Sequence, residues 1–174
     1  MKYIRQEHKE RKEVYYFEVD DDNVALRQAT QIDNKLIVSN RPFDKLHFFL
    51  TDQEVCSTIE EEIEKAEFEL VWNTGVEPFK ENWNRTVQTI SIGQEIQGFM
   101  EIFYPQGIII NFNNVTFGLT DYWDVRNNTE PDYFKVRQKV RGTVKGFDNS
   151  NLWVILDNCK VMIESVSQKN GNIT

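Results

Sequence analysis

Hydrophobic and polar positions alternate in short runs through the first part of the chain. Glu13–Val19 is rich in Val, Tyr and Phe, and the run Asp20–Asn23 ends it with residues that favour turns. Two further runs follow, Val24–Ile32 and Lys35–Val38, with an Asp-Asn turn between them. This pattern predicts a meander of β-hairpins, with Leu46–Leu50 as a further strand.

A helical period replaces the alternation after residue 56. Apolar residues recur there at three- and four-residue spacing, at Ile59, Ile63, Ala66 and Leu70. Ser57 or Thr58 is the predicted N-cap, because an acidic residue stands three positions after each of them, as in a capping box. Gly75 and Pro78 mark the predicted end. The sequence therefore predicts one helix with a single apolar face.

The stretch Asn73–Gln88 contains Gly, Pro and several Asn, which is typical of a linker. Phe79 and Trp83 are expected to pin this linker to the body of the protein. We therefore place a domain boundary near Thr89, with one domain over residues 1–88 and a second over residues 89–174.

The C-terminal half carries five short β segments and no helical stretch of useful length. Among them are Ile96–Phe103, Ile108–Phe112 and Val140–Phe147, and a hairpin turn at residues 148–151 leads into Leu152–Leu156. Five strands with a longer excursion after the third fit a barrel of the OB type. The residues predicted to be buried are Ile96, Ile108, Ile110, Val140, Val144 and Ile155. The predicted fold class is mainly β, and α+β overall.

Sequence landmarks in this half have a definite order. They are Gly93–Gly98, Gly107 before Ile108–Phe112, Gly118-Leu119, the pattern Val136-x-x-Lys139-Val140, and Asp148 in the last hairpin. With these landmarks, residues 90–162 resemble an S1 RNA-binding domain. The resemblance implies an OB barrel that contacts RNA or another single-stranded nucleic acid.

The residues that bind RNA in S1 domains are only partly matched. S1 domains usually stack bases on aromatics that flank the central glycine, and Gln106 and Ile109 stand at those places here. Asp121 stands where a histidine usually follows the Gly-Leu pair. The candidate replacement platforms are Tyr104, Tyr122 and Trp123, for which the alternative is ordinary packing or surface exposure.

Basic residues recur at a spacing of two after the predicted excursion. They are Lys135, Arg137, Lys139 and Arg141, and Lys145 keeps the same phase. In a strand, this spacing places all five on one face and Val136, Val140 and Val144 on the other. Such a stripe is suited to neutralising several phosphates, and the alternative is the solvated face of a half-buried strand.

Acidic residues dominate the N-terminal half. Residues 1–90 hold 12 basic and 19 acidic side chains, whereas residues 91–174 hold 8 and 9, within a net charge of −8. This balance argues against strong non-specific binding to nucleic acid but permits a local basic patch. Glu60, Glu61 and Glu64 lie on the predicted helix, as its solvated face or as a surface for a basic partner.

Two segments of the N-terminal half also carry a resemblance. The first segment is Tyr16–Asp20 together with Arg27-Gln28, and the second is Ile63–Trp72 with its Glu-Phe-Glu-x-x-Trp end. With these segments, residues 13–73 are similar to a family of uncharacterised bacterial domains. Some members of that family occur near toxin–immunity genes. The resemblance implies a protein-binding module, such as an immunity protein that covers the basic active site of a toxin.

The motifs of catalysis and of metal binding are missing from the sequence. It has no glycine-rich phosphate loop, nucleophile elbow or metal-spaced His/Cys group, and only two histidines. We therefore expect a protein that is not an enzyme and that needs no cofactor or metal. Cys56 and Cys159 are expected to be buried or half-buried thiols. The charged N-terminus and the absence of a long apolar run predict a cytoplasmic protein outside the membrane.

Three hypotheses of function follow. The first is a binding protein whose S1-like barrel contacts RNA or another anionic ligand. The second is a protein-binding module, such as an immunity protein, with a basic toxin as its partner. The third is a sensor of a small molecule or cyclic nucleotide, which ranks last because no pocket motif is visible.

Overall fold

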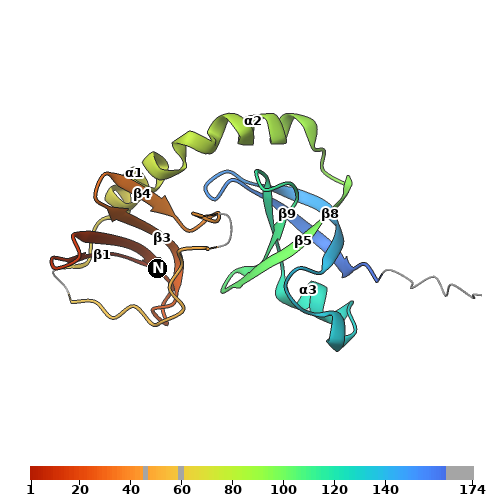
Figure 1. Ribbon diagram of the computed structural model, residues 1–174, viewed down its shortest axis with the longest axis horizontal. Helices are drawn as coiled ribbons and strands as arrows, with labels where there is room; N and C mark the ends of the chain where they lie inside the picture. The colour runs from red at the N-terminus through yellow and green to blue at the C-terminus, as the bar shows by residue number, and fades with distance from the viewer. Residues whose placement is uncertain (45–46, 59–60, 164–174) are drawn as a thin grey trace, which may run out of the picture.

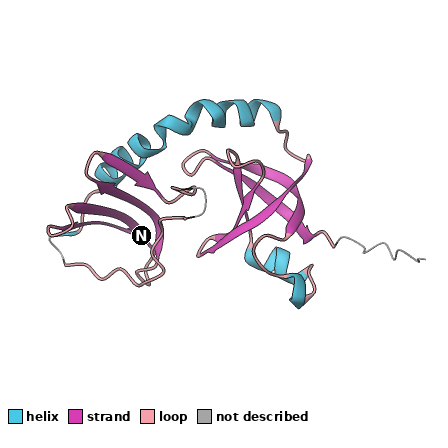
Figure 2. Cartoon of the chain, in the orientation of Figure 1, coloured by secondary structure: helices cyan, strands magenta, loops and turns pink. Residues whose placement is uncertain are grey.

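The structure is a computed structural model that describes residues 1–44, 47–58 and 61–163 of the chain. A four-stranded sheet lies at one side and a closed five-stranded barrel at the other, and a helical segment runs across the top of both (Figure 1). The colouring by secondary structure shows that strands form most of the ordered chain (Figure 2). The fold class is therefore mainly β, as predicted.

The N-terminal sheet is an antiparallel meander. Its strands are β1 (Lys2–His8), β2 (Glu13–Val19), β3 (Ala25–Ile32) and β4 (Lys35–Val38), paired in that order. The last three were predicted, whereas β1 was missed because its residues are mostly charged or polar and only Ile4 is fully buried. Residues 47–50 form no strand, which corrects that prediction, and Leu46 lies outside the described residues.

The helical segment begins later than predicted. It consists of α1 (Lys65–Val76), the 3-10 helix η2 (Glu77–Phe79) and α2 (Lys80–Thr89). The Thr58 N–H does donate to Oε2 of Glu61 at 2.8 Å, as in a capping box. However, the Ile63 N–H donates to the Tyr3 carbonyl at 2.9 Å, which ties the following residues to the edge of β1. A cap at Ser57 or Thr58 is therefore wrong, and Ile59 lies outside the described residues.

The predicted linker is helical as well. Gly75 lies within α1, and Pro78 lies in the first turn of η2, where its missing N–H leaves no helical hydrogen bond unmade. Both residues were expected to end the helix. Trp83 of α2 is buried, and its indole N–H donates to Oδ1 of Asn149 in the barrel at 2.9 Å. An aromatic anchor was predicted here and is confirmed.

Gly75 allows α1 to lie close to β4, and this contact gives a stability prediction. A Cβ at this position would lie 2.3 Å from Cγ1 of Val38, a buried and stiff β-branched side chain. Replacing glycine by alanine in a helix gains about 1 kcal/mol, whereas overpacking costs about 1–3 kcal/mol. We expect Gly75→Ala to lower the free energy of unfolding in urea. Gly146→Ala, which meets no atom within 4 Å, is the control and should be nearly neutral.

The C-terminal barrel closes in the order β5-β6-β7-β9-β8. Its strands are β5 (Glu95–Tyr104), β6 (Gly107–Asn111), β7 (Phe117–Thr120), β8 (Lys139–Asp148) and β9 (Trp153–Val161). Only β7 and β9 pair in parallel. The excursion after the third strand holds α3 (Tyr122–Asn127) and η3 (Pro131–Tyr133), two short helices that were not predicted. The five strands and this excursion make the OB-type barrel that the sequence predicted.

The barrel core contains most of the residues predicted for it. Ile108, Ile110, Val140 and Val144 are buried, whereas Ile96 and Ile155 are only half-buried. In β9 the buried neighbours of Ile155 are Val154 and Leu156. The pairing of β8 with β9 is irregular between Val144 and Gly146. Because side chains alternate across a strand, burial of 154 and 156 directs 155 to the outer face.

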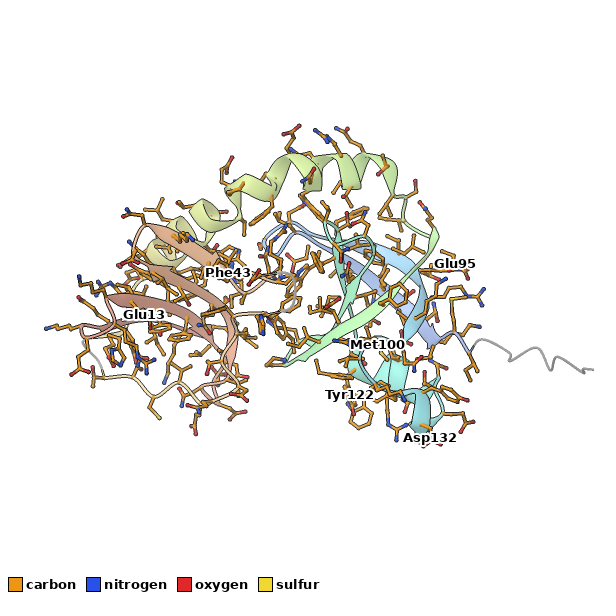
Figure 3. All side chains as sticks on the ribbon, viewed as in Figure 1. Glu13, Phe43, Glu95, Met100, Tyr122 and Asp132 are labelled. Atoms are coloured by element: carbon orange, nitrogen blue, oxygen red, sulfur yellow. The ribbon has the colours of Figure 1, made fainter. Side chains whose placement is uncertain are left out.

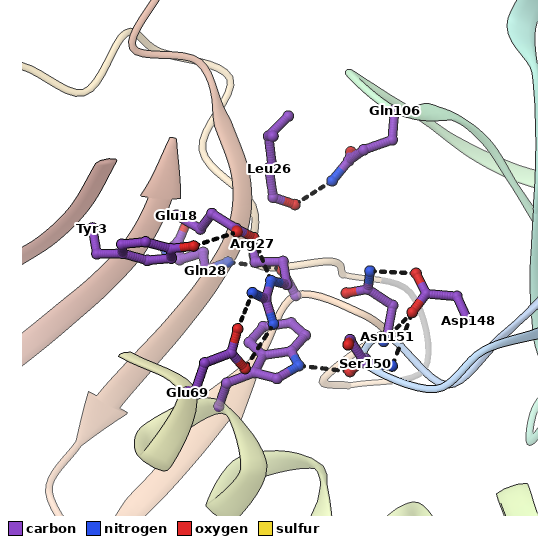
Figure 4. Close-up of polar contacts among 12 residues, drawn as sticks. Tyr3, Glu18, Leu26, Arg27, Gln28, Glu69, Gln106, Asp148, Ser150 and Asn151 are labelled. Atoms are coloured by element: carbon purple, nitrogen blue, oxygen red, sulfur yellow. Dashed lines mark hydrogen bonds and ion pairs between the residues drawn. The ribbon is translucent and has the colours of Figure 1, made fainter. Parts of the chain in front are cut away.

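A buried ion cluster joins the N-terminal sheet to α1. The Arg27 guanidinium lies between Glu18 of β2 and Glu69 of α1 (Figure 4), with 2.6 Å from Nη2 to Oε1 of Glu69. Its guanidinium also lies over the rings of Phe68 and Trp72. Burial acts to lower the pKa of Arg27, but its hydrogen bonds to the two carboxylates outweigh burial and raise the pKa.

Candidate nucleic-acid interface

The outer face of β6 and β7 is covered by the N-terminal half of the chain. OB barrels commonly bind oligonucleotides on this face, together with the loops that follow the first and fourth strands. Here Ile109 and Phe117 on that face are buried, as is Trp153 of β9, which pairs with Phe117. The Phe48 ring packs edge-on against Phe117, with the ring centres 6.2 Å apart. The usual ligand face of the fold is therefore closed to solvent.

The two loops beside this face are held by hydrogen bonds to the N-terminal half. The Gln106 side chain, between β5 and β6, donates to the Leu26 carbonyl. Between β8 and β9, the Asn151 carbonyl accepts from the Asn40 amide at 2.9 Å. The Trp153 indole N–H donates to the Asn40 carbonyl at 2.8 Å. Both loops are thus engaged in packing the two halves together.

Tyr104 belongs to this covered interface. Its hydroxyl donates to the Ser39 carbonyl at 2.7 Å, and only 8 % of its surface is exposed. Burial raises the pKa of the Tyr104 hydroxyl well above its usual range. Tyr104 was predicted as a platform for a base, and the structure corrects this prediction because its ring is packed against Phe48 and Trp153.

The predicted basic stripe is divided between a turn and a strand. Lys139 and Arg141 lie on β8, but Lys135 and Arg137 precede it in a turn, and Arg137 has a left-handed φ of 67°. Here the Arg137 N–H donates to the Met100 carbonyl at 2.7 Å. One alternating strand from 135 to 145 is therefore wrong. Val136, predicted to share a face with Val140 and Val144, is 44 % exposed, whereas those two are buried.

The outer face of β8 nevertheless carries positive charge. Arg141 pairs across the strands with Lys160 of β9, a cation that was not predicted from the sequence. Nη1 of Arg141 lies 3.4 Å from the Glu95 carboxylate. Lys139 pairs with the exposed Phe99 of β5. Lys145 is exposed near the other end of β8. Lys135 and Arg137, by contrast, follow Phe134, whose ring packs on Tyr122 of α3, and Lys139 begins β8 shortly after them.

An aromatic cluster lies at this α3 end. Tyr122 and Trp123 were both predicted as platforms, and their ring centres lie 5.0 Å apart. Phe103 and Phe134 complete the cluster, at 6.2 Å and 5.1 Å from the Tyr122 ring. Trp123 is 64 % exposed. Figure 3 shows Tyr122 beside α3, below the barrel and on the side opposite α2.

Asp121 orients this aromatic cluster. Its carboxylate caps α3 and accepts the backbone N–H groups of Trp123 and Asp124 at 2.8 and 3.0 Å. Asp121 is therefore a helix cap that fixes Tyr122 and Trp123 in place. Sequence reasoning missed Phe103 and Phe134, although the position of Phe134 directly before Lys135 was a signal for it.

The acidic residues of the alternative hypothesis do not share a helix face. Glu61 precedes α1 and accepts hydrogen bonds from the backbone and hydroxyl of Thr58, and Glu64 is the residue just before α1. Glu60 lies outside the described residues. The predicted helical face is wrong because this segment follows β1 instead, and a role in binding a basic toxin stays a prediction.

The two cysteines differ in exposure. Cys159 is buried, as predicted, whereas Cys56 is exposed, which corrects that expectation. Burial raises the pKa of the Cys159 thiol to about 11. Because the thiolate is the reactive form, we expect one cysteine of the folded protein to react rapidly with Ellman's reagent at neutral pH. Cys56→Ser should remove this fast phase, and its survival would contradict the burial of Cys159.

The described residues hold no group of three His, Cys, Asp or Glu side chains placed to bind a metal ion. Over the same ranges, none of the helices has the length and apolar character needed to cross a membrane.

Comparison with known proteins identifies a partial likeness in fold. No family model matches the chain, and no curated protein matches it in sequence. The apo form of Mycoplasma genitalium RNase R aligns at a TM-score of 0.37 and 15 % identity, over 55 % of this chain and 17 % of that one. The same enzyme in complex with ribose-methylated single-stranded RNA aligns at 0.38 and 15 %, over 52 % and 16 %. The aligned part is a small share of RNase R, and at these TM-scores the likeness does not bear on function.

Proposed function

We propose that this protein binds single-stranded RNA at the α3 end of its barrel and does not act on it as an enzyme. The observation that supports this most strongly is the aromatic cluster of Phe103, Tyr122, Trp123 and Phe134, which adjoins a basic segment. Aromatic platforms beside cations are the common means of binding single strands, because every base has a face that stacks.

The cluster and the residues beside it offer partners for both the base and the phosphate of a nucleotide. Trp123 offers an exposed ring for a base, and Phe134 connects the cluster directly to Lys135. The Arg126 guanidinium lies over the Phe134 ring, 5.4 Å from its centre, and adds a further cation. Asp132 and Glu130 are exposed nearby and set a limit on affinity, since they repel phosphate.

The resemblance to S1 domains supports RNA as the ligand, although the site differs from the usual one. Because the outer face of β6 and β7 is covered, an RNA strand has no room to lie across Ile109 and Phe117. The α3 end is exposed and lies away from the N-terminal sheet (Figure 1). RNA binding here therefore requires no separation of the two halves.

The salt dependence of binding tests the basic part of this site. Replacing Lys135, Arg137 and Lys139 together by Gln should flatten the slope of log affinity against log salt by about 2, because each contact with a single-strand phosphate contributes about 0.7. The measurement is fluorescence anisotropy of a labelled oligouridylate between about 50 and 200 mM salt.

A matched control changes the same number of charges elsewhere. Lys9, Arg11 and Lys12 are exposed in the turn between β1 and β2, at the far side of the N-terminal sheet. Their replacement by Gln should leave the slope nearly unchanged. Equal slopes for both triple variants would show that the segment from Lys135 to Lys139 is only a solvated surface.

A further inference from the structure

Arg41, which follows β4, is a buried cation that has no acidic partner among the residues that the structure describes. Only 9 % of the residue is exposed, and its Nε donates to Oδ1 of Asn40 at 3.3 Å. Its guanidinium lies 3.8 Å from the centre of the Phe79 ring. Within residues 1–44, 47–58 and 61–163, no carboxylate lies within ion-pair distance of it. Burial lowers the pKa of Arg41 to about 10.

Arg27 shows how this fold satisfies a buried guanidinium elsewhere. Arg27 is 6 % exposed, and two carboxylates, Glu18 and Glu69, bind it directly. Arg41 is buried to almost the same degree but has a neutral amide and a ring face as partners. A ring face attracts a cation but carries no net charge. The charge of Arg41 is therefore available to a ligand.

A cavity of about 220 Å³ opens beside the Arg41 side chain. It is lined from three directions, by Arg41 and Pro42, by Phe79 and Asn82 of the helical segment, and by Asn114 of the β6–β7 loop. Within the described ranges, the side-chain amide nitrogens of Asn82 and Asn114 donate to no acceptor. A neighbouring cavity of about 310 Å³ shares Asn82 and extends along α2 to Arg85.

We propose that the Arg41 cavity binds the phosphate group of a small ligand. Arg41 supplies the opposite charge in its wall, and the amides of Asn82 and Asn114 donate from α2 and from the barrel loop. A tetrahedral oxyanion accepts hydrogen bonds from several directions, whereas a planar carboxylate is satisfied by one guanidinium edge. Donors on separate walls therefore favour phosphate over carboxylate.

This site is separate from the proposed RNA surface. Its residues belong to η2 and α2, the segment after β4, the β6–β7 loop and the start of β7, whereas the aromatic cluster lies beside α3 on the opposite side of the barrel (Figure 1). The phosphate site therefore goes beyond the proposed function and does not rest on it.

Calorimetric titration of the full chain with inorganic phosphate tests the proposal. A second titration with acetate, at matched ionic strength, tests whether a carboxylate binds instead. We expect phosphate to bind and Arg41→Gln to abolish binding. Asn82 is exposed, so Asn82→Asp should leave Arg41 in place. The new carboxylate should repel phosphate and raise its Kd about ten-fold or more. Asn84→Asp is the matched control, because it adds the same charge to α2 at a residue that lines neither cavity, and it should change the Kd by less than about two-fold.

Several results would overturn the proposal. The absence of phosphate binding to the unmodified protein would do so, as would equal effects of the Asn82 and Asn84 variants. Tighter binding of acetate than of phosphate would show that the cavity selects a carboxylate instead. If Arg41→Gln fails to fold, the comparison between Asn82→Asp and Asn84→Asp still decides.

Discussion

Replacing Trp123 by alanine should weaken RNA binding by about 5- to 150-fold, because stacking of one base contributes about 1–3 kcal/mol and about 1.4 kcal/mol corresponds to ten-fold. Trp123 is 64 % exposed, and its ring packs edge-on against Tyr122, with the ring centres 5.0 Å apart. Stacking releases no counterions, so the salt dependence of binding should stay as in the unmodified protein. Anisotropy titration with the labelled oligouridylate measures both quantities.

Two controls separate stacking from a general loss of aromatic surface. Phe43→Ala removes an exposed ring that lies between the two halves of the chain (Figure 3) and should leave RNA affinity unchanged. Tyr104→Phe removes the hydroxyl that donates to Ser39 and should affect stability but not affinity. If Trp123→Ala binds RNA as tightly as the unmodified protein, the aromatic cluster is not a platform for bases.

Replacing Arg27 by methionine should lower the free energy of unfolding by about 3–5 kcal/mol, the usual effect of removing one partner from a buried ion pair. Glu18 and Glu69 would then be left as two carboxylates near each other without a cation. Urea denaturation followed by circular dichroism measures the change. The contacts of Arg27 with Phe68 and Trp72 would also be lost.

A rescue variant adds a second test, because it removes the two carboxylates that would be left without their cation. Replacing Glu18 and Glu69 by Leu as well should restore stability at neutral pH, and a loss below about 1 kcal/mol for Arg27→Met would contradict this account.

Apart from β1, the strands of both halves were predictable because their patterns are local. Alternation of apolar and polar residues identified β2, β3 and β4, and the order of glycines and strands identified the barrel. The start of the helix was not predictable, because Thr58 and Glu61 form a capping-box hydrogen bond in a segment held against β1. A long-range contact there outweighs a local preference.

The candidate site was predictable only in part, for the same reason. Tyr122 and Trp123 were found because they are neighbours in sequence, but Phe103 reaches them from β5. The covering of β6 and β7 depends on contacts between segments that lie far apart in the chain, such as Phe48 with Phe117. No local pattern carries that information.

The Glu-Phe-Glu-x-x-Trp segment has a structural explanation. Phe68, Glu69 and Trp72 all contact Arg27. The Trp72 indole N–H also donates to the Ser150 carbonyl of the barrel at 2.7 Å. This segment therefore joins the N-terminal sheet, α1 and the barrel. Its distinctive composition is accounted for by packing and does not by itself require a protein partner.

The four tryptophans allow the most direct test of where RNA binds. Trp123 lies at the α3 end, whereas Trp153 is buried under the N-terminal half on the usual ligand side of the barrel. With fluorotryptophan incorporated and each resonance assigned by substitution, fluorine NMR reports both sites during a titration with oligouridylate. We expect the Trp123 resonance to shift or broaden while the Trp153 resonance stays in place. A shift of Trp153 with Trp123 unchanged would show that RNA opens the covered face and would contradict binding at the α3 end.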